Sequence, residues 1–280
     1  MRRLEPPLVR LGELKKMSVT ENQEFSIESL PDGAIFRLTR PAKLNALTKP
    51  MLLGLSACLD DLQARGLQLL VITGAGEKSF CAGTDLAETR KVSQPERLDK
   101  SQMARELFAR LSRAPIISVA AINGLAYGGG LELAMACTFR VAAPHVTVSL
   151  PEIKLGLLPA YAGTQFLPAL VGQARALDLM LTGRSVPAQE ALAMGLLSRV
   201  LEPGTDLLAA ALDLAREVTR FSPSAIDGIR RCVAAAGAQV TDEGLAVEDA
   251  VVREVFVSDN AREGIAAFLE KRPANFSKTR

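Results

Sequence analysis

The sequence predicts an α/β domain of layered strands and helices, followed by a C-terminal region of helices. Two short, continuous apolar runs, at 69–72 and 115–122, are typical of strands that are buried on both faces. Each run is followed by a turn or loop with glycine and then by a segment of helical periodicity, and this alternation favours an α/β fold. Strand signals nearly vanish after Gly163, and the sequence beyond Pro203 is helical in pattern to about Lys271.

The N-terminal part begins with a segment that we expect to be a disordered extension, residues 1–17. It is basic and contains two prolines, yet it has glutamates and no serine, unlike a transit peptide, and Met17 is a candidate for the native start. Residues 26–38 are interpreted as two short strands joined by a turn at Pro31-Asp32-Gly33. Thr48 is the expected N-cap of a helix that ends at Gly66, because leucines recur along it at the spacing of one helical face.

The remaining elements continue the alternation. The predicted elements are a strand from 69 that ends at Gly74, a helix at 98–111, a strand at 115–122, a helix from Leu131, strands at 139–141 and 146–149, a short helix between Pro187 and Gly195, and a last strand at 197–201. Gly74-Ala75-Gly76 could suggest a dinucleotide-binding fingerprint, but Ser79 occupies the place of its third glycine, so we expect an ordinary turn. The helical region after the core must pack on the core or on another subunit.

The composition argues against several classes of function. The 280 residues are 48% hydrophobic and 23% charged, and 33 basic against 31 acidic residues give a net charge of +2. This balance provides no broad field to attract nucleic acid or an anionic membrane, and no apolar run approaches the ~20 residues of a membrane span. One histidine, His145, and four cysteines without a CxxC pair do not favour a metal site or a Ser-His-Asp triad. We expect Cys58 and Cys137 to be buried free thiols and the protein to be cytoplasmic, with no metal, nucleic-acid or membrane partner.

Three segments of small residues, each after an expected buried strand, are the candidates for chemistry: 79–86, 123–132 and 150–159. The second contains Gly128-Gly129-Gly130 directly before a predicted helix. Glycines destabilise regular elements by up to ~1 kcal/mol each relative to alanine, so three in a row indicate a close approach of the backbone or positive φ angles. The first N–H groups of a helix lack intrahelical partners and favour negative charge, which suits an oxygen that becomes anionic during a reaction. Tight packing of backbone on backbone is the alternative.

Glu132 and Glu152 lie beside these turns in otherwise apolar stretches. Buried carboxylates are rare unless they are paired or functional. If both lie in one pocket, like-charge repulsion raises one pKa and leaves one acid and one base near neutral pH. The alternative is that each is solvated or paired with an arginine, for which Arg140 is a candidate.

Taken together, these segments resemble the signature blocks of the crotonase, or enoyl-CoA hydratase/isomerase, superfamily. The matching blocks are SFCAGTD, NGLAYGGGLELA, LPEIKLGLLP with Gly163-Thr164-Gln165, Arg40-Pro41 with Asn45-Ala46-Leu47, TGRSVPAQEALAMGLLSRV and REGIAAFLEKR, in the expected order over roughly 20–275. The resemblance implies a spiral core of repeated ββα units over 18–204 and a helical region over 205–280 that builds trimers, commonly paired as hexamers. It also implies an acyl-CoA thioester as substrate, with no separate cofactor.

The resemblance implies roles for particular residues. Two backbone N–H groups that hold the thioester oxygen in the family match Thr84 and Gly129. The two glutamates that bracket the catalytic water in hydratases match Glu132, the expected base that activates the water, and Glu152, the expected proton donor to Cα. Further substrate contacts are expected at Lys43, Ala82, Asp85 and Tyr161, and from the C-terminal tail of a neighbouring subunit at Phe268 and Lys271.

The two glutamates favour a 2-enoyl-CoA hydratase. A Δ3,Δ2-enoyl-CoA isomerase, which generally needs one carboxylate, or another crotonase reaction such as dehydration of a specialised acyl-CoA, is the alternative. A non-catalytic RNA-binding protein on the same scaffold is a more distant one. The chain departs from typical hydratases at 159–163, where Pro-Ala-Tyr-Ala-Gly stands in place of Pro-Gly-x-Gly-Gly, and Tyr161 is expected to shorten or polarise the acyl pocket.

Overall fold

The computed structural model describes residues 19–236, 242–256 and 258–276, so the expected extension at 1–17 lies outside the described residues. The strands are β1 (Val19–Glu21), β2 (Phe25–Leu30), β3 (Gly33–Leu38), β4 (Leu69–Gly74), β5 (Ser79–Cys81), β6 (Ile117–Ile122), β7 (Leu125–Tyr127), β8 (Phe139–Ala142), β9 (Thr147–Ser149), β10 (Val186–Pro187) and β11 (Arg199–Val200). The helices are α1 (Lys49–Ala64), α2 (Leu86–Thr89), α3 (Gln94–Arg113), α4 (Gly129–Ala136), α5 (Gly163–Val171), α6 (Gln173–Thr182), α7 (Ala188–Ala193), α8 (Leu207–Thr219), α9 (Pro223–Ala235), α10 (Asp242–Phe256) and α11 (Asp259–Glu270), with short 3-10 turns η1 (Pro41–Lys43) and η2 (Glu152–Leu155).

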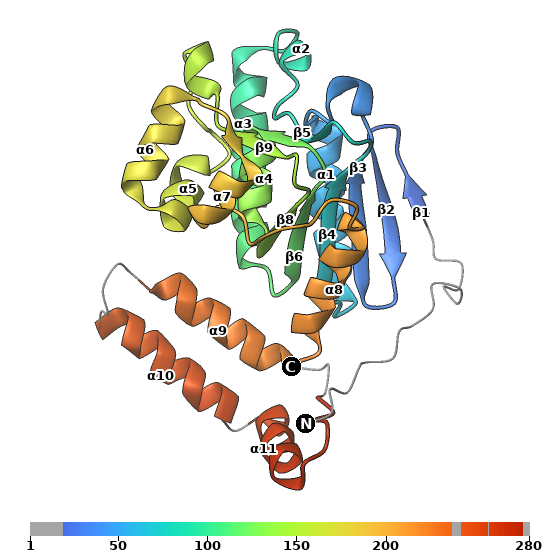
Figure 1. Cartoon of the computed structure of the whole chain (residues 1–280), viewed down its shortest axis with the longest axis vertical. Coiled ribbons are helices and arrows are strands. Elements are labelled where there is room, and N and C mark those ends of the chain that lie inside the picture. The colour runs from blue at the N-terminus through green and yellow to red at the C-terminus, as the bar shows by residue number, and fades with distance from the viewer. Residues whose placement is uncertain (1–18, 237–241, 257, 277–280) are drawn as a thin grey trace.

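Two sheets form the centre of the molecule (Figure 1). The larger has seven strands in the order β1-β2-β3-β4-β6-β8-β11. Its first three strands are antiparallel, and the others run parallel from β3 onward. The smaller sheet has the order β10-β9-β7-β5, in which β5, β7 and β9 are parallel neighbours.

Successive strand pairs generate a spiral. In each of the pairs β4–β5, β6–β7 and β8–β9, the first strand joins the large sheet and the second joins the small sheet, and a helical segment follows. This is the repeat of ββα units that the sequence implied. The first strands are long and apolar because helices or the second sheet cover both their faces, and every residue of β4 and β6 is buried.

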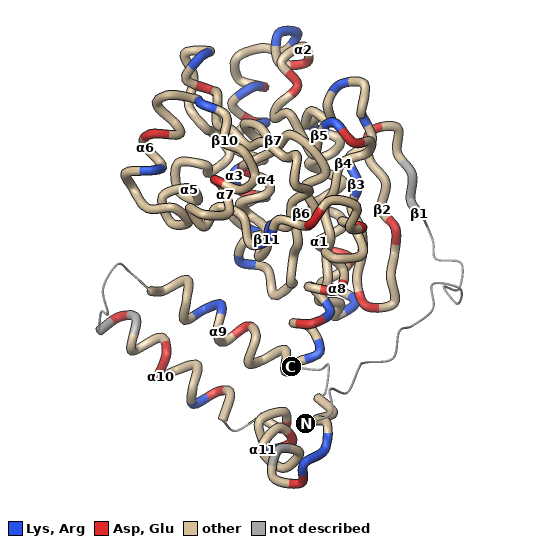
Figure 2. The backbone as a smooth tube through the Cα atoms, viewed as in Figure 1, with Lys and Arg blue, Asp and Glu red and all other residues tan. Residues whose placement is uncertain are grey.

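Alternate residues of the large sheet serve two apolar cores. Leu70 and Ile72 of β4 point into the main core, together with buried leucines of α1 and with Phe108 of α3. Leu69 and Val71 point to the opposite face, where α8 covers the sheet. The period of two along a strand therefore explains how one apolar run packs against two different layers. Figure 2 shows charges of both signs interspersed along the outer helices, whereas the central strands β4 and β6 carry none.

Several boundaries differ from the prediction. The segments at 79–86 and 123–132 were predicted to be loops but contain β5 and β7, three-residue strands stabilised by pairing within the small sheet rather than by their own sequence. The helix expected from Leu131 begins at Gly129, because Gly128 takes a positive φ of 52° and acts as N-cap. No element was predicted for α5 and α6, which span 163–182.

The C-terminal region is helical, as predicted, and its parts lie differently with respect to the sheets. α8 packs on the large sheet through Leu214 and Ala215, whereas α9 and α10 lie side by side away from the sheets (Figure 1). Large apolar side chains remain exposed on these outer helices, among them Val233 and Phe256. Such surfaces suit the predicted contact with other subunits, which stays a prediction. Within the described residues, no helix combines the length and apolar character needed to cross a membrane.

Candidate functional site

The site lies where the small sheet ends. Because β5, β7 and β9 are parallel neighbours, the segments that follow their carboxyl ends lie side by side. These segments are the three candidates for chemistry, so the topology brings together residues that are far apart in sequence. A cavity of about 470 Å³ opens between them, and its walls include Ala82, Thr84, Gly129, Glu132, Glu152 and Tyr161.

Two backbone N–H groups face this cavity without a partner among the described residues, those of Thr84 and Gly129. Gly129 is the first residue of α4, where the N–H has no intrahelical acceptor. The Thr84 N–H is left over because Leu47 bonds to the residues on either side, donating to Gly83 O at 2.7 Å and accepting from Asp85 N at 3.1 Å. Two uncommitted N–H groups beside a helix N-terminus suit an oxygen that gains negative charge.

Gly83 allows the two donors to come close. Its φ of +96° lies in the region that L side chains rarely adopt, and a Cβ placed there would be 3.0 Å from Tyr127 O and 3.2 Å from Gly129 N. The glycine therefore provides both a turn of the backbone and room for the two loops to touch. The expectation made for Gly128-Gly129-Gly130 is met at two of these glycines, since Gly128 has a φ of +52° and a Cβ on Gly130 would lie 2.1 Å from Cys81 O.

Glu132 is buried in the first turns of α4, with 1% of its surface exposed. Its Oε1 accepts two hydrogen bonds of 2.7 Å, from the N–H groups of Tyr161 and Gly163. Its pKa is raised to about 7: burial contributes most to the rise, the nearby charge of Glu152 adds to it, and the N–H groups of Gly163 and Tyr161 oppose it. The side chain is thus fixed in orientation and exchanges its proton near neutral pH.

Glu152 begins η2 and reaches the same cavity from the third segment. Its Oε2 is buried and has no hydrogen-bond partner among the described residues. Burial raises the pKa of this carboxyl as well. Two carboxyls with raised pKa values in one cavity compete for a proton, which is the arrangement that the sequence suggested for an acid and a base.

Arg140, the candidate partner for these glutamates, does not pair with either of them in the described contacts. It is buried, and its guanidinium donates to the carbonyl oxygens of Leu196 at 2.7 Å and Cys137 at 2.8 Å. The carboxylates therefore lack a counter-ion from this residue, which is consistent with their raised pKa values.

Tyr161 connects the parts of the site. Its ring is 7% exposed and packs edge-on against Phe108, with ring centroids 5.9 Å apart. Its phenol donates a 3.0 Å hydrogen bond to Thr84 Oγ1, while its backbone N–H holds Glu132. The sequence marked Tyr161 as a departure from typical hydratases but gave no sign of these partners.

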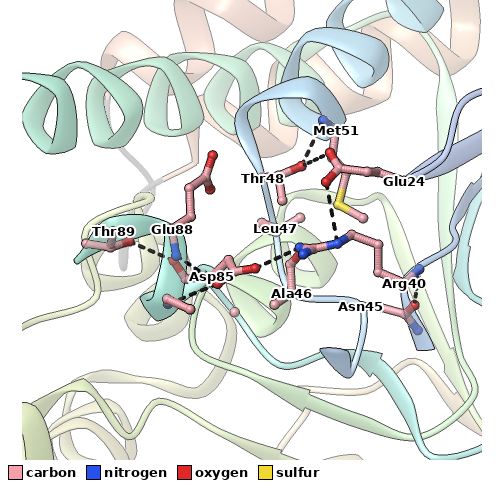
Figure 3. A network of polar contacts seen from close by, with 12 residues as sticks. Glu24, Arg40, Asn45, Ala46, Leu47, Thr48, Met51, Asp85, Glu88 and Thr89 are labelled. Carbon is pink, nitrogen blue, oxygen red and sulfur yellow. Dashed lines mark hydrogen bonds and ion pairs between the residues drawn. The ribbon is translucent and has the colours of Figure 1, made fainter. Parts of the chain in front are cut away.

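Asp85 supports the first loop instead of lining the cavity. It is the N-cap of α2, where its Oδ1 accepts the N–H groups of Ala87 at 3.0 Å and Glu88 at 3.1 Å. Arg40 Nη1 donates to its Oδ2 at 2.9 Å (Figure 3). Burial alone would raise the pKa of Asp85, but the Glu88 N–H and the Arg40 guanidinium outweigh that effect and lower it. Asp85 thus fixes the start of α2, directly after Thr84.

The remaining expected substrate contacts lie elsewhere. Lys43 is exposed at the end of η1 and does not line the cavity, and Lys271 is exposed just after α11. The backbone of Phe268 is part of α11, but its side chain lies outside the described residues. The two tail residues were expected to act on a neighbouring subunit, so their predicted role stays a prediction.

The structure adds a buried lysine that the sequence did not single out. Lys100 of α3 is 9% exposed, lines the cavity, and donates from Nζ to Glu88 Oε2 at 2.6 Å and to Leu47 O at 3.0 Å. It lies in a helix with many polar residues, so nothing in the pattern distinguishes it. His145 is exposed, and no cluster of metal-binding side chains is present among the described residues.

Comparison with known proteins places this site in a family. The family model for enoyl-CoA hydratase/isomerase matches residues 34–279. The chain belongs to this crotonase family. A crotonyl-CoA hydratase from Syntrophomonas wolfei is 36% identical over 248 residues, which cover 87% of this chain and 94% of the relative. An enoyl-CoA isomerase/hydratase from Mycosarcoma maydis is 34% identical over 249 residues, covering 86% of this chain and 90% of that relative.

The solved structures agree with this crotonase assignment. The crystal structure of an enoyl-CoA hydratase from Bacillus anthracis is 33% identical and superposes with a TM-score of 0.85, covering 91% of this chain and 100% of that one. The predicted fold class is therefore confirmed as a crotonase fold of two mixed sheets with C-terminal helices. The relatives carry the names of hydratases and of isomerases. Family membership therefore gives the activity as enoyl-CoA hydratase/isomerase and does not distinguish between the two reactions.

Proposed function

We propose that this crotonase is an enoyl-CoA hydratase, which adds water across the 2,3 double bond of an acyl-CoA thioester. The observation that supports this most directly is the presence in one cavity of the buried carboxyl of Glu132, the carboxyl of Glu152 with its buried Oε2, and two uncommitted N–H donors. Hydration needs a base for the water, an acid for Cα and donors for the thioester oxygen, and the cavity offers one group for each task.

The thioester carbonyl is expected to bind with its oxygen at the N–H groups of Thr84 and Gly129. As water adds to Cβ, the electrons of the double bond move to that oxygen and form an enolate. Each N–H donor of this kind contributes typically ~2.7–4 kcal/mol to the transition state. The positive end of the α4 dipole acts on the same oxygen, since Gly129 is its first residue.

The hydrogen bonds favour distinct roles for the two carboxyls. Two N–H groups point at Glu132 Oε1 and stabilise its anion, so Glu132 is the better base to take the proton from water. Glu152 Oε2 has no donor among the described residues and burial raises the pKa of this carboxyl, so we assign Glu152 as the group that gives a proton to Cα. The proton taken from water by Glu132 and the proton given by Glu152 balance, and exchange with solvent restores the starting state.

An isomerase is the second candidate, favoured by the isomerase/hydratase names among the relatives. Moving a double bond from position 3 to position 2 requires one carboxyl to take a proton from Cα and return it to Cγ. In that case only one of the two glutamates would be essential. RNA binding is disfavoured by the interspersed charges of both signs in Figure 2 and by the buried carboxyls.

The test is a pair of absorbance assays with purified protein. Crotonyl-CoA should lose its conjugated-thioester absorbance, and Glu132→Gln and Glu152→Gln should each slow the loss by about 10²–10⁴-fold. Glu202→Gln, which changes an exposed glutamate outside the cavity, is the matched control and should leave the rate unchanged. If 3-hexenoyl-CoA gains that absorbance instead, and only one Gln variant is impaired, the protein is an isomerase and the hydratase proposal is wrong.

A further inference from the structure

Tyr161 contacts every part of the proposed machinery except Glu152. Its phenol bonds to the side chain of Thr84, its backbone N–H bonds to Glu132, and its ring packs on Gly129. The ring contact is close, because a Cβ placed on Gly129 would lie 2.9 Å from two ring carbons. One side chain therefore lies against both residues that supply the N–H donors, while its own backbone holds the base.

The ring is held rigidly. It is buried, and Phe108 of α3 packs against it edge-on at an interplanar angle of 83°. Burial raises the pKa of the phenol to about 12, so its proton remains available for the bond to Thr84 at neutral pH. A rigid donor fixes the position of the group that accepts from it.

The backbone orientation of Thr84 depends on contacts that hold it in place. It follows Gly83, whose φ of +96° reflects the wide conformational freedom of glycine. Leu47 clamps the backbone from one side, through bonds of 2.7 Å and 3.1 Å to Gly83 and Asp85. The phenol of Tyr161 provides an anchor from the other side of the cavity, 77 residues further along the chain.

We propose that Tyr161 is a positioning residue, whose phenol pins Thr84 so that the Thr84 N–H is aimed at the thioester oxygen while the same segment orients Glu132. This inference rests on the proposed oxyanion role of Thr84 and Gly129. The phenol itself touches neither water nor thioester in this scheme. Its effect should therefore appear in the chemical step and in the polarisation of the carbonyl, with little effect on binding.

Tyr161→Phe is the test variant, because it removes the hydroxyl and keeps the ring and the N–H bond to Glu132. We expect kcat for crotonyl-CoA to fall about three- to tenfold, as for the loss of one hydrogen bond, with KM nearly unchanged. Tyr127→Phe is the matched control. Tyr127 is the other of the two tyrosines, and its hydroxyl bonds at 3.1 Å to Thr147 and at 2.8 Å to Ser185, outside the cavity, so kcat should stay unchanged.

A second readout does not depend on hydration. Dimethylaminocinnamoyl-CoA absorbs at longer wavelength when its thioester carbonyl is polarised, so its shift on binding reports the oxyanion donors directly. Tyr161→Phe should reduce that shift, and the Tyr161→Phe and Thr84→Val changes should be non-additive in a double-mutant cycle, since both remove one bond. If the wild type shows the shift but hydrates nothing, the proposed hydratase function fails while the positioning role is still tested. An unchanged shift and kcat in a folded Tyr161→Phe protein, or additive effects, would overturn the inference.

Discussion

Gly83→Ala offers a direct test of the close approach between the two donor loops. The alanine would have to keep a φ of +96°, and its Cβ would lie 3.0 Å from Tyr127 O and 3.2 Å from Gly129 N. A backbone conformation of this kind costs an L residue about 1–2 kcal/mol. The contact must in addition be relieved by moving the loops apart, which displaces both N–H donors.

The expected size of the effect follows from the donors. Misplacing one donor of this type lowers kcat by about 10²–10³-fold, so Gly83→Ala should lose at least that much activity toward crotonyl-CoA. Gly66→Ala is the matched control, because Gly66 also has a positive φ, +64°, but a Cβ there would meet nothing within 4 Å. Gly66→Ala should lose about 1–2 kcal/mol in urea unfolding, Gly83→Ala should lose more because of the added contact, and only Gly83→Ala should lose activity. A folded Gly83→Ala protein with kcat within about twofold of wild type would refute the proposed arrangement of the donors.

Two further predictions concern charge. The folded pKa of Glu132, about 7 against an ordinary 4.5, means that the native state holds this proton more tightly than the unfolded state does. The free energy of unfolding should therefore fall by about 3 kcal/mol as pH rises from about 4.5 to 7, and urea titrations of Glu132→Gln should lack this fall. Activity should follow a bell-shaped pH profile, because one carboxyl must be ionised and the other protonated, and its two apparent pKa values belong to the pair. Arg40→Met should cost about 1–3 kcal/mol at pH 7, because Asp85 keeps its charge and loses its partner. Since the pKa of Asp85 is lowered in the folded state, this stabilisation is present above the unfolded value and is lost as pH falls through the folded one, so the difference between wild type and variant should shrink below pH about 4. An Arg40→Met protein as stable as wild type at pH 7 would show that the ion pair does not hold the loop.

The long apolar strands could be predicted from the sequence, and the short strands could not. β4 and β6 are covered on both faces, so their sequences are continuously apolar and recognisable. β5 and β7 are three residues long and are stabilised by pairing with each other. This pairing joins segments that are far apart in sequence, so no local pattern predicts it. The start of α4 was misplaced for a related reason, because glycines that favour a loop in isolation are here required by backbone packing. A Cβ on Gly130 would lie 2.1 Å from Cys81 O.

Some residues of the candidate site could likewise be predicted from the sequence, and others could not. Glu132, Glu152, Thr84 and Gly129 were identified because they occur in recognisable blocks, and the structure places all of them on one cavity. The partners that tune them could not be identified, since each depends on a contact across the fold. Lys100 donates a hydrogen bond to Leu47, 53 positions away in the chain. Sequence periodicity and motif spacing cannot predict a contact of this kind.

The placement of the proposed donor and the proposed base on α4 explains why the fold would suit hydration. Gly129 and Glu132 are three residues apart at the start of one buried helix, so a rigid element would set the distance between the proposed oxyanion donor and the proposed base. The proposed acid, Glu152, lies in η2, and the neighbouring strands β7 and β9 set its distance from α4. The positive end of the α4 dipole favours both the enolate oxygen and the ionised Glu132, which opposes the effect of burial on the base. The site can therefore bury Glu132, which raises the pKa of this carboxyl to about 7, and still allow it to ionise near neutral pH.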